Sequence, residues 1–284
     1  MSDIYQTVTN QIIEALEQSG ELELPWIGEA PIHRPVNAKS RNSYQGINTL
    51  TLWIKSHCQE IQSNVWATYK QWKELGCQVK KGEKSSPIIF YKEYLSPDDE
   101  EETRYVARAS HVFNASQVEG YEIETQTVPK QPLFERLEKV DQFVAATNAT
   151  ITHQGRQAYY DPATDSITIP EINRFVPTET STAQEGYYST LLHELTHWTG
   201  PRLERDLEGR FGSQSYAMEE LVAELGAAFL CSDLQITNRP RDDHAAYIKN
   251  WLQVLNDDRK AIFTAASLAS KATAFLHQTT KPPH

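Results

Sequence analysis

Residues 193–197 have the types and the spacing needed to bind a metal ion and activate water. They read His-Glu-Leu-Thr-His, an H-E-x-x-H motif. In a helix, residues four apart share one face, so the imidazoles of His193 and His197 can reach a single ion. Glu194 lies between them and can accept a proton from water held by that ion. Because a hydrolytic zinc site takes three protein ligands and keeps one open position, the motif predicts a further ligand elsewhere.

A helix must hold these residues in place, and the surrounding sequence predicts one at 189–198. Three leucines and Trp198 give this segment an apolar stripe, and Gly200 followed by proline can end it. The competing interpretation is a pair of surface histidines on an ordinary amphipathic helix. The metal site is favoured because a second helix with acidic residues follows.

That second helix is expected at 216–231, where apolar residues recur on one face. Glu220 and Glu224 stand one turn apart on it. A carboxylate on a largely apolar helix is costly unless it is paired or bound to metal. Twenty-two residues lie between His197 and Glu220, which leaves room for a loop and a returning helix.

This spacing resembles the gluzincin pattern, in which H-E-x-x-H is followed by two acids one turn apart. In that pattern the first acid binds zinc and the second orients a ligand histidine. The resemblance implies Glu220 as the third ligand and Glu224 as the orienting partner, and the reverse assignment stays open. Glu219 is a weaker candidate and is expected to be solvated.

The expected chemistry is hydrolysis of an amide. A zinc ion acidifies its bound water, and Glu194 accepts the proton and passes it to the leaving amine. The developing oxyanion needs a further hydrogen-bond donor. Tyr216, one turn before Glu220, is the main candidate, and Tyr187 and Tyr188 are weaker ones, although a tyrosine at such a place is more often a packing residue.

Composition excludes several classes of protein. The chain has 284 residues and a net charge of −11, and its three cysteines form no C-x-x-C pair, as expected for reduced cysteines. Residues 1–18 suggest an amphipathic helix without the basic start and apolar run of a signal peptide. Because no stretch approaches the roughly 18 apolar residues of a membrane span, we expect a cytoplasmic protein with no membrane partner.

A basic window at 30–92 indicates a second function. It contains ten lysines and arginines against three glutamates, in a chain that is acidic as a whole. Aromatic residues are interleaved with these charges, which suits single-stranded DNA because phosphates need neutralisation and bases need stacking partners. The alternative is that the tryptophans belong to a core and the lysines are simply solvated. The candidate DNA contacts are Arg41, Tyr44, Trp66, Tyr69, Lys70, Trp72, Lys80, Lys81 and Lys84.

The pattern along the chain predicts an α+β protein of two domains, residues 1–128 and 129–284, separated near a polar linker that contains prolines. The first domain is expected to hold helices at 4–18, 48–59 and 65–75, and a hairpin of strands at 87–95 and 104–113 around an acidic loop at 96–103. The second is expected to hold a helix at 133–148, a hairpin at 158–169, the two site helices, and a long helical region at 244–277. In zincins, which the site motif resembles, such a hairpin borders the cleft.

Clustered motifs extend over nearly the whole chain. They are Y-x-G-x-N at 44–48, W-x-x-Y-K-x-W at 66–72, G-x-x-V-x-K-G-E-K at 76–84, V-F-N-x-x-Q at 112–117, Y-Y at 159–160, I-P at 169–170, H-E-L-x-H-W-x-G at 193–200 and E-E-L-x-A-E at 219–224. Together they are much more specific than H-E-x-x-H alone. With these motifs the chain resembles the ArdC-type antirestriction proteins of conjugative plasmids.

That resemblance implies an N-terminal domain that binds single-stranded DNA and a zincin-like metallopeptidase domain with Zn²⁺ or another divalent metal. It also implies a role in shielding incoming plasmid DNA from host restriction, with an unknown protein as substrate. The alternative is a DNA-coating protein whose zincin domain is a non-proteolytic scaffold. The intact Glu194 favours a competent site, because a scaffold has no need for a general base.

Overall fold

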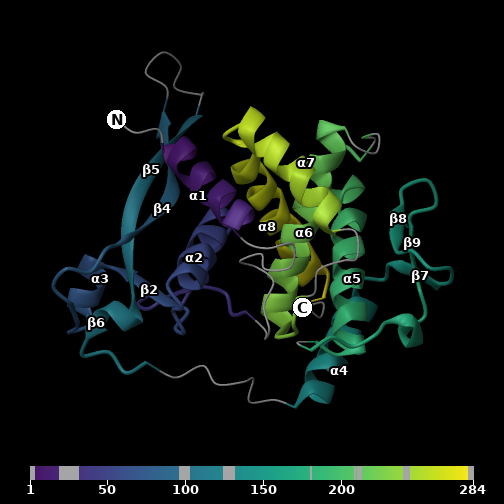
Figure 1. The fold of residues 1–284 in the computed structure, drawn as a ribbon, viewed down its shortest axis with the longest axis horizontal. Helices are drawn as coiled ribbons and strands as arrows, with labels where there is room; N and C mark the ends of the chain where they lie inside the picture. The colour runs from purple at the N-terminus through teal and green to yellow at the C-terminus, as the bar shows by residue number, and fades with distance from the viewer. Residues whose placement is uncertain are drawn as a thin grey trace. The chain divides into compact units, whose positions relative to one another are not determined.

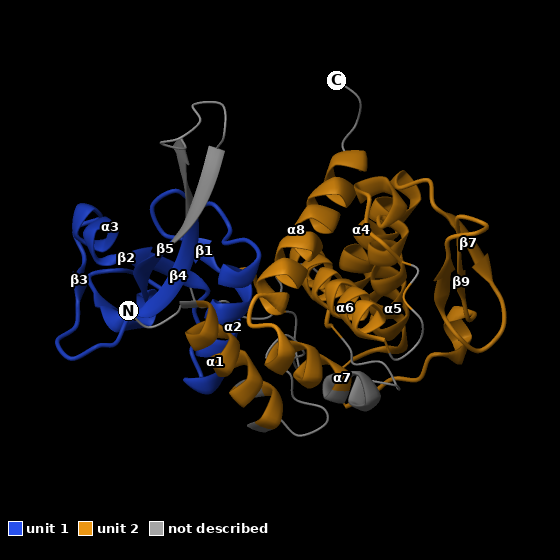
Figure 2. Ribbon diagram, turned by 90° about the horizontal axis from the view of Figure 1, so that it is seen from above, with its two compact units in different colours: residues 1–4, 35–126 blue, residues 5–34, 127–284 orange. Residues whose placement is uncertain are grey.

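The computed structural model describes residues 4–18, 32–95, 103–123, 132–179, 181–207, 209, 213–238 and 244–280. Figure 1 shows the fold, and Figure 2 shows its two compact units. The first unit comprises residues 1–4 and 35–126, and the second comprises residues 5–34 and 127–284. The expected domains, 1–128 and 129–284, place the N-terminal helix in the first domain, whereas nearly all of this helix belongs to the second unit.

The first unit is a small α+β fold around a four-stranded sheet. Its elements are β1 (Val36–Asn37), α2 (Ile47–Cys58), β2 (Val65–Thr68), α3 (Tyr69–Glu74), β3 (Gln78–Val79), β4 (Ser86–Leu95), β5 (Thr103–Asn114), the short 3₁₀ turn η1 (Ala115–Gln117) and β6 (Val118–Glu119). The sheet has the order β1-β2-β5-β4, with only β1 and β2 parallel, and β3 pairs with β6. The predicted hairpin is confirmed as β4 and β5, and residues 96–102 of the acidic loop lie outside the described residues.

Residues 65–75 do not form one helix, and that prediction was wrong. Residues 65–68 form β2, which pairs with β5, and α3 starts only at Tyr69. Thr68 sets the boundary: its hydroxyl accepts from the Gln71 amide at 3.2 Å, and the Gln71 side chain accepts from the Thr68 amide at 3.0 Å. This reciprocal capping starts a helix, and the branched and aromatic residues before it favour a strand.

The core of the first unit contains both tryptophans of the 66–72 motif. Trp66 packs with Leu52 and Val112, and Trp72 belongs to the neighbouring apolar cluster. Both indoles are 0% exposed, and the Trp72 Nε1–H donates to the Phe113 carbonyl oxygen at 3.0 Å. The two side chains therefore hold β2 and α3 against the rest of the unit.

The second unit is mainly helical and contains a three-stranded sheet. Its elements are α1 (Ile4–Gln18), α4 (Leu133–Ala146), β7 (Thr150–His153), β8 (Tyr159–Asp161), β9 (Ser166–Ile169), η2 (Ile172–Arg174), α5 (Ala183–Trp198), η3 (Pro201–Leu203), α6 (Gln214–Leu234), α7 (His244–Asp257) and α8 (Ala261–Thr279). Strand β9 is central, parallel to β7 and antiparallel to β8, so the predicted hairpin at 158–169 is confirmed and β8 forms a sheet edge. The long helical region expected at 244–277 is two helices, because the chain turns after Asp258, whose carboxylate accepts from the Lys260 amide at 2.8 Å.

Helix α1 packs against the C-terminal part of the second unit. Its apolar stripe, which includes Val8 and Ile12, is almost completely buried. The Thr9 hydroxyl donates to the Arg259 carbonyl oxygen at 2.8 Å. The amphipathic pattern of residues 4–18 thus reflects a face that is buried by residues distant in sequence.

Helix α6 is the central helix of the second unit and contacts α5, α7 and α8. It is buried over most of its circumference, which explains why its apolar residues are not confined to a single stripe. Its crossing with α5 is close, because a Cβ placed on Gly226 would lie only 2.5 Å from Thr196 Cγ2. No helix in the described parts of the chain is long and apolar enough to cross a membrane.

Candidate metal centre

Helices α5 and α6 carry every residue of the predicted metal site. The H-E-x-x-H residues occupy the C-terminal end of α5, and the acidic residues lie in the first half of α6. His193, Glu194, Glu220 and Glu224 are each less than a tenth exposed. Ionisable groups are buried together in this way only where they interact with one another or bind an ion.

The three predicted ligands face a common point. The Nε2 atoms of His193 and His197 are 3.2 Å apart. Glu220 Oε2 lies 3.5 Å from His193 Nε2, and Glu220 Oε1 lies 3.6 Å from His197 Nε2. Ligand atoms about 2.05 Å from zinc in tetrahedral geometry lie about 3.3 Å from one another. The nitrogen and carboxylate donors therefore fit a small divalent ion in both chemistry and spacing.

The remaining acids lie behind the histidines, at their Nδ1 atoms. Glu224 Oε2 is 3.9 Å from His193 Nδ1, and Glu219 Oε1 is 3.0 Å from His197 Nδ1. The expectation that Glu219 is solvated was wrong: its side chain is 11% exposed and pairs with Arg205. The sequence pattern did not identify Arg205, because it lies in the irregular loop between the two helices.

The acidic neighbours control the protonation of His197. Burial lowers the pKa of this imidazole, but the hydrogen bonds and charges of Glu219 and Glu220 outweigh burial and raise the pKa to about 10. For Glu220, burial acts in the opposite direction and raises the carboxyl pKa. The hydrogen bonds and charges of the two histidines outweigh burial and bring the pKa of Glu220 well below its usual range. His197 would have to lose its Nε2 proton to hold a metal ion, so metal affinity should weaken as the pH falls.

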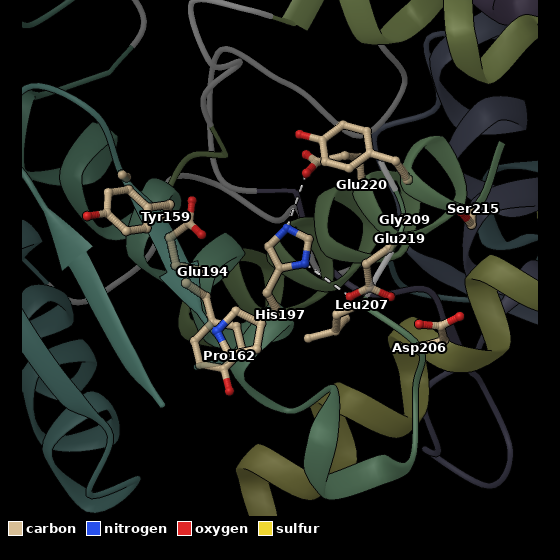
Figure 3. A pocket seen from close by; sticks show the side chains of 13 residues that line it. Tyr159, Pro162, Glu194, His197, Asp206, Leu207, Gly209, Ser215, Glu219 and Glu220 are labelled. Carbon is tan, nitrogen blue, oxygen red and sulfur yellow. Dashed lines mark hydrogen bonds and ion pairs between the residues drawn. The ribbon is translucent and has the colours of Figure 1, made fainter. Parts of the chain in front are cut away.

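The cluster opens into a pocket of about 220 Å³. Glu194, His197 and Tyr216 line it from α5 and α6, and Tyr159 and Tyr160 line it from the edge strand β8. In Figure 3 the His197 imidazole lies between two carboxylates, Glu220 at one ring nitrogen and Glu219 at the other. Two of the predicted metal ligands, His197 and Glu220, and the predicted general base Glu194 therefore line the same pocket.

Only one of the three candidate tyrosine donors lies at the pocket. Tyr216 is in its wall. The Tyr187 hydroxyl is instead 2.8 Å from His153 Nε2, and the Tyr188 hydroxyl donates to Asp141 at 2.5 Å. Tyr187 and Tyr188 thus pack in the core between α5 and its neighbours, as the alternative interpretation of them expected.

The edge-strand wall of the pocket is tied to the end of α5. Asp165, in the turn between β8 and β9, accepts from Arg202 at 2.7 and 3.0 Å and from the Tyr160 hydroxyl at 2.9 Å. The Arg202 guanidinium also stacks 3.5 Å from the centre of the Trp198 ring. Sequence reasoning gave no signal for this connection, because its partners are separated by 37 residues.

Most of the candidate DNA contacts lie on the surface of the first unit. Tyr69 is 49% exposed, and Tyr44 is half-buried with its hydroxyl accepting from Asn37 Nδ2 at 3.0 Å. The exposed basic candidates are Arg41, Lys70, Lys80, Lys81 and Lys84. The exposed basic side chains and the ring of Tyr69 are thus the candidates available in this unit for a polyanion.

The prediction that Trp66 and Trp72 contact DNA was wrong. Because both indoles are fully buried, neither can stack on a base in this fold. Their interleaving with basic residues suggested stacking, but both are core residues, Trp66 on β2 and Trp72 on α3. The competing core interpretation was the right one for these two side chains.

Comparison with known proteins finds two family matches along the chain. Residues 2–121 match the N-terminal domain of the anti-restriction factor ArdC, and residues 138–268 match a zincin-like metallopeptidase. The Mn(II)-bound crystal structure of the antirestriction ArdC protein from the R388 plasmid aligns with a TM-score of 0.81 and 35% identity, covering 99% of this chain and 100% of that one. This chain belongs to the ArdC family. The resemblance inferred from the motifs and the α+β fold with a zincin-like domain are confirmed.

Two further relatives differ in length. Protein y4eC of Sinorhizobium fredii (strain NBRC 101917 / NGR234) is 40% identical over 97% of this chain and 92% of that protein. DNA primase TraC of Escherichia coli is 35% identical over 94% of this chain, but the match covers only 19% of TraC. The ArdC-family chain thus corresponds to one part of a much longer primase.

Proposed function

We propose that this protein is a cytoplasmic antirestriction factor that binds single-stranded DNA with its first unit and cleaves a protein with a zinc centre in its second. Its role would be to protect incoming plasmid DNA from host restriction. The observation that carries the proposal is the spacing of 3.2 to 3.6 Å among the donor atoms of His193, His197 and Glu220. Membership of the ArdC family supports the biological role.

In this proposal the residues of the second unit have distinct roles. His193, His197 and Glu220 hold the ion, which would supply a Lewis acid and an acidified water. Glu194 is 1% exposed and lines the pocket, so it can accept a proton and return it to a leaving amine in a largely dry site. Tyr216 can donate to the oxyanion of the substrate. Glu224 keeps His193 oriented from its Nδ1 side.

The substrate would be an extended polypeptide. Strand β8 is an edge of its sheet and also lines the pocket through Tyr159 and Tyr160. A peptide can pair with a free strand edge through main-chain hydrogen bonds, which brings a scissile carbonyl to a fixed place without strict demands on sequence. DNA bound by the first unit would raise the local concentration of proteins on the same strand.

Single-stranded DNA is the proposed partner of the first unit. Its exposed lysines and arginine would neutralise phosphates, and Tyr69 would stack on a base. Tyr44, whose hydroxyl is bonded within the unit, would contribute the edge of its ring.

Metal analysis and four substitutions test this function. We expect about one zinc per chain by mass spectrometry of the native protein, lost in H193A and E220A and only weakened in E224A. The variant E194Q should keep zinc and DNA binding but lose proteolysis, and its ability to protect plasmid transfer into a restricting recipient should then be measured. Loss of zinc in E224A but not in E220A would reverse the roles of the two glutamates. Protection that survives in E194Q would favour the DNA-coating alternative.

A further inference from the structure

Arg205 joins the two helices that carry the metal ligands. It lies in the loop after α5, and its side chain is only 4% exposed. Its guanidinium donates to both carboxylate oxygens of Glu219 on α6, from Nε at 3.1 Å and from Nη2 at 3.0 Å. It also donates to the end of α5, from Nη2 to the Thr196 carbonyl at 2.6 Å and from Nη1 to Thr199 Oγ1 at 2.8 Å. One planar group thus connects both helices.

Glu219 transmits this constraint to a metal ligand. Its Oε1 atom accepts from Arg205 and also lies 3.0 Å from His197 Nδ1. A carboxylate at Nδ1 keeps a proton on that nitrogen, which leaves the Nε2 lone pair for the ion. Without the guanidinium, Glu219 would lose the bonds that fix both of its oxygens, and the His197 ring would lose a fixed partner.

We propose that Arg205 is a positioning residue for the metal centre and acts through Glu219 to hold His197 in its ligating tautomer and orientation. This inference rests on the proposed metal centre and adds a residue from outside the H-E-x-x-H pattern. The planar fork of an arginine matches two carboxylate oxygens while its other donors reach α5. A lysine at 205 offers a single ammonium and cannot make all four contacts.

The same loop offers a matched control. Arg202 also donates to the end of α5, through the Trp198 carbonyl at 2.7 Å, but its carboxylate partner is Asp165 between β8 and β9. Removing Arg202 therefore removes an arginine from the end of α5 while the contacts among Arg205, Glu219 and His197 stay in place.

The test measures the Zn²⁺ dissociation constant of the full chain by competition with a chromophoric chelator. R205A should bind Zn²⁺ roughly 10- to 100-fold more weakly than the native protein, the usual effect of losing a group that orients a ligand. R205K should recover little, and R202A should match the native protein. Added guanidinium ion should restore part of the affinity of R205A, whereas sodium chloride at the same concentration should not. Thermal unfolding of the metal-free proteins checks that R205A is folded.

The outcomes separate this inference from the proposed function. If the native protein binds no Zn²⁺, the proposed metal centre itself fails. If it binds Zn²⁺ and R205A binds equally well, or if the loss in R205A is not relieved by guanidinium, Arg205 has no positioning role and the metal centre stands. If R205A does not fold, E219Q replaces it, because this variant keeps the shape of Glu219 and removes its charge. Native affinity in E219Q would then overturn the inference.

Discussion

The substitution Gly226→Ala tests whether the metal centre depends on the close crossing of α5 and α6. Gly226 lies on α6, six residues after Glu220, and faces Thr196, the neighbour of His197. An added Cβ would lie 2.5 Å from Thr196 Cγ2, whereas ordinary contacts begin at 3.4 Å, so the helices must separate by about 0.9 Å unless Thr196 moves. Thr196 has little freedom, because it is fully buried and its hydroxyl donates to the Leu192 carbonyl at 2.9 Å.

Two opposing effects set the expected change in stability. Alanine in place of glycine inside a helix contributes about 1 kcal/mol, and overpacking a core costs about 1 to 3 kcal/mol. We therefore expect a net loss between about 0 and 2 kcal/mol in the free energy of unfolding. The metal site tolerates far less movement, since donor distances must hold within about 0.2 Å. Zinc affinity should therefore fall roughly 10- to 100-fold.

The assay combines urea unfolding of the metal-free protein with a zinc titration on G226A, T196A and the double variant. In the double variant the nearest side-chain atom of residue 196 is its Cβ, 3.1 Å from the new methyl group. Because most of the clash is gone, the double variant should bind zinc more tightly than G226A. If G226A kept native zinc affinity and gained stability, the crossing would not constrain the site and this reasoning would be refuted.

Substitutions in three other parts of the protein test the remaining features. Glutamine in place of Lys80, Lys81 and Lys84 should weaken binding to single-stranded DNA and reduce the slope of log affinity against log salt by about 2; an unchanged slope would place the DNA elsewhere. Tyr69→Ala should cost about 1 to 3 kcal/mol of binding to an oligonucleotide and Tyr69→Trp should not, so equal affinities of the two would argue against stacking. For Glu185, burial raises the carboxyl pKa, but bonds from threonine amides and hydroxyls outweigh it and lower the pKa. The ionised Glu185 carboxylate therefore stabilises the fold above its pKa in the unfolded chain, about 4.3. This stabilisation is lost as the pH falls through the lower pKa of Glu185 in the folded protein. In Glu185→Gln the free energy of unfolding should depend less on pH in that range. A pH dependence equal to that of the native protein would contradict the lowered pKa of Glu185.

The parts of the site that the sequence predicted are those set by local spacing. His193 and His197 share a helix face, and the apolar pattern around Glu220 indicated a buried helix, so both elements could be predicted from periodicity. The prediction that Glu219 is solvated was wrong because its burial depends on Arg205, which lies in a loop without periodicity. Contacts between distant irregular segments carry no local signal.

The errors in the first unit have a related cause. Trp66 and Trp72 lie among basic residues, and that composition is shared by a stacking surface and by a core with a charged exterior. Only the tertiary packing separates the two cases. The predicted helix over 65–75 includes the strand at 65–68 because apolar periodicity alone does not locate a helix start, which here is set by the capping pair of Thr68 and Gln71.

The placement of α1 has a consequence for synthesis of the chain. The contact between Thr9 and Arg259 joins residues 250 apart. At about 5 to 20 residues per second, the N-terminal helix waits roughly 10 to 50 s after its own translation before this partner exists. Residues 35–126 are complete much earlier and form a separate compact unit. On a ribosome, the first unit can therefore fold before the helix that precedes it, and the second unit closes only after Arg259 has been synthesised.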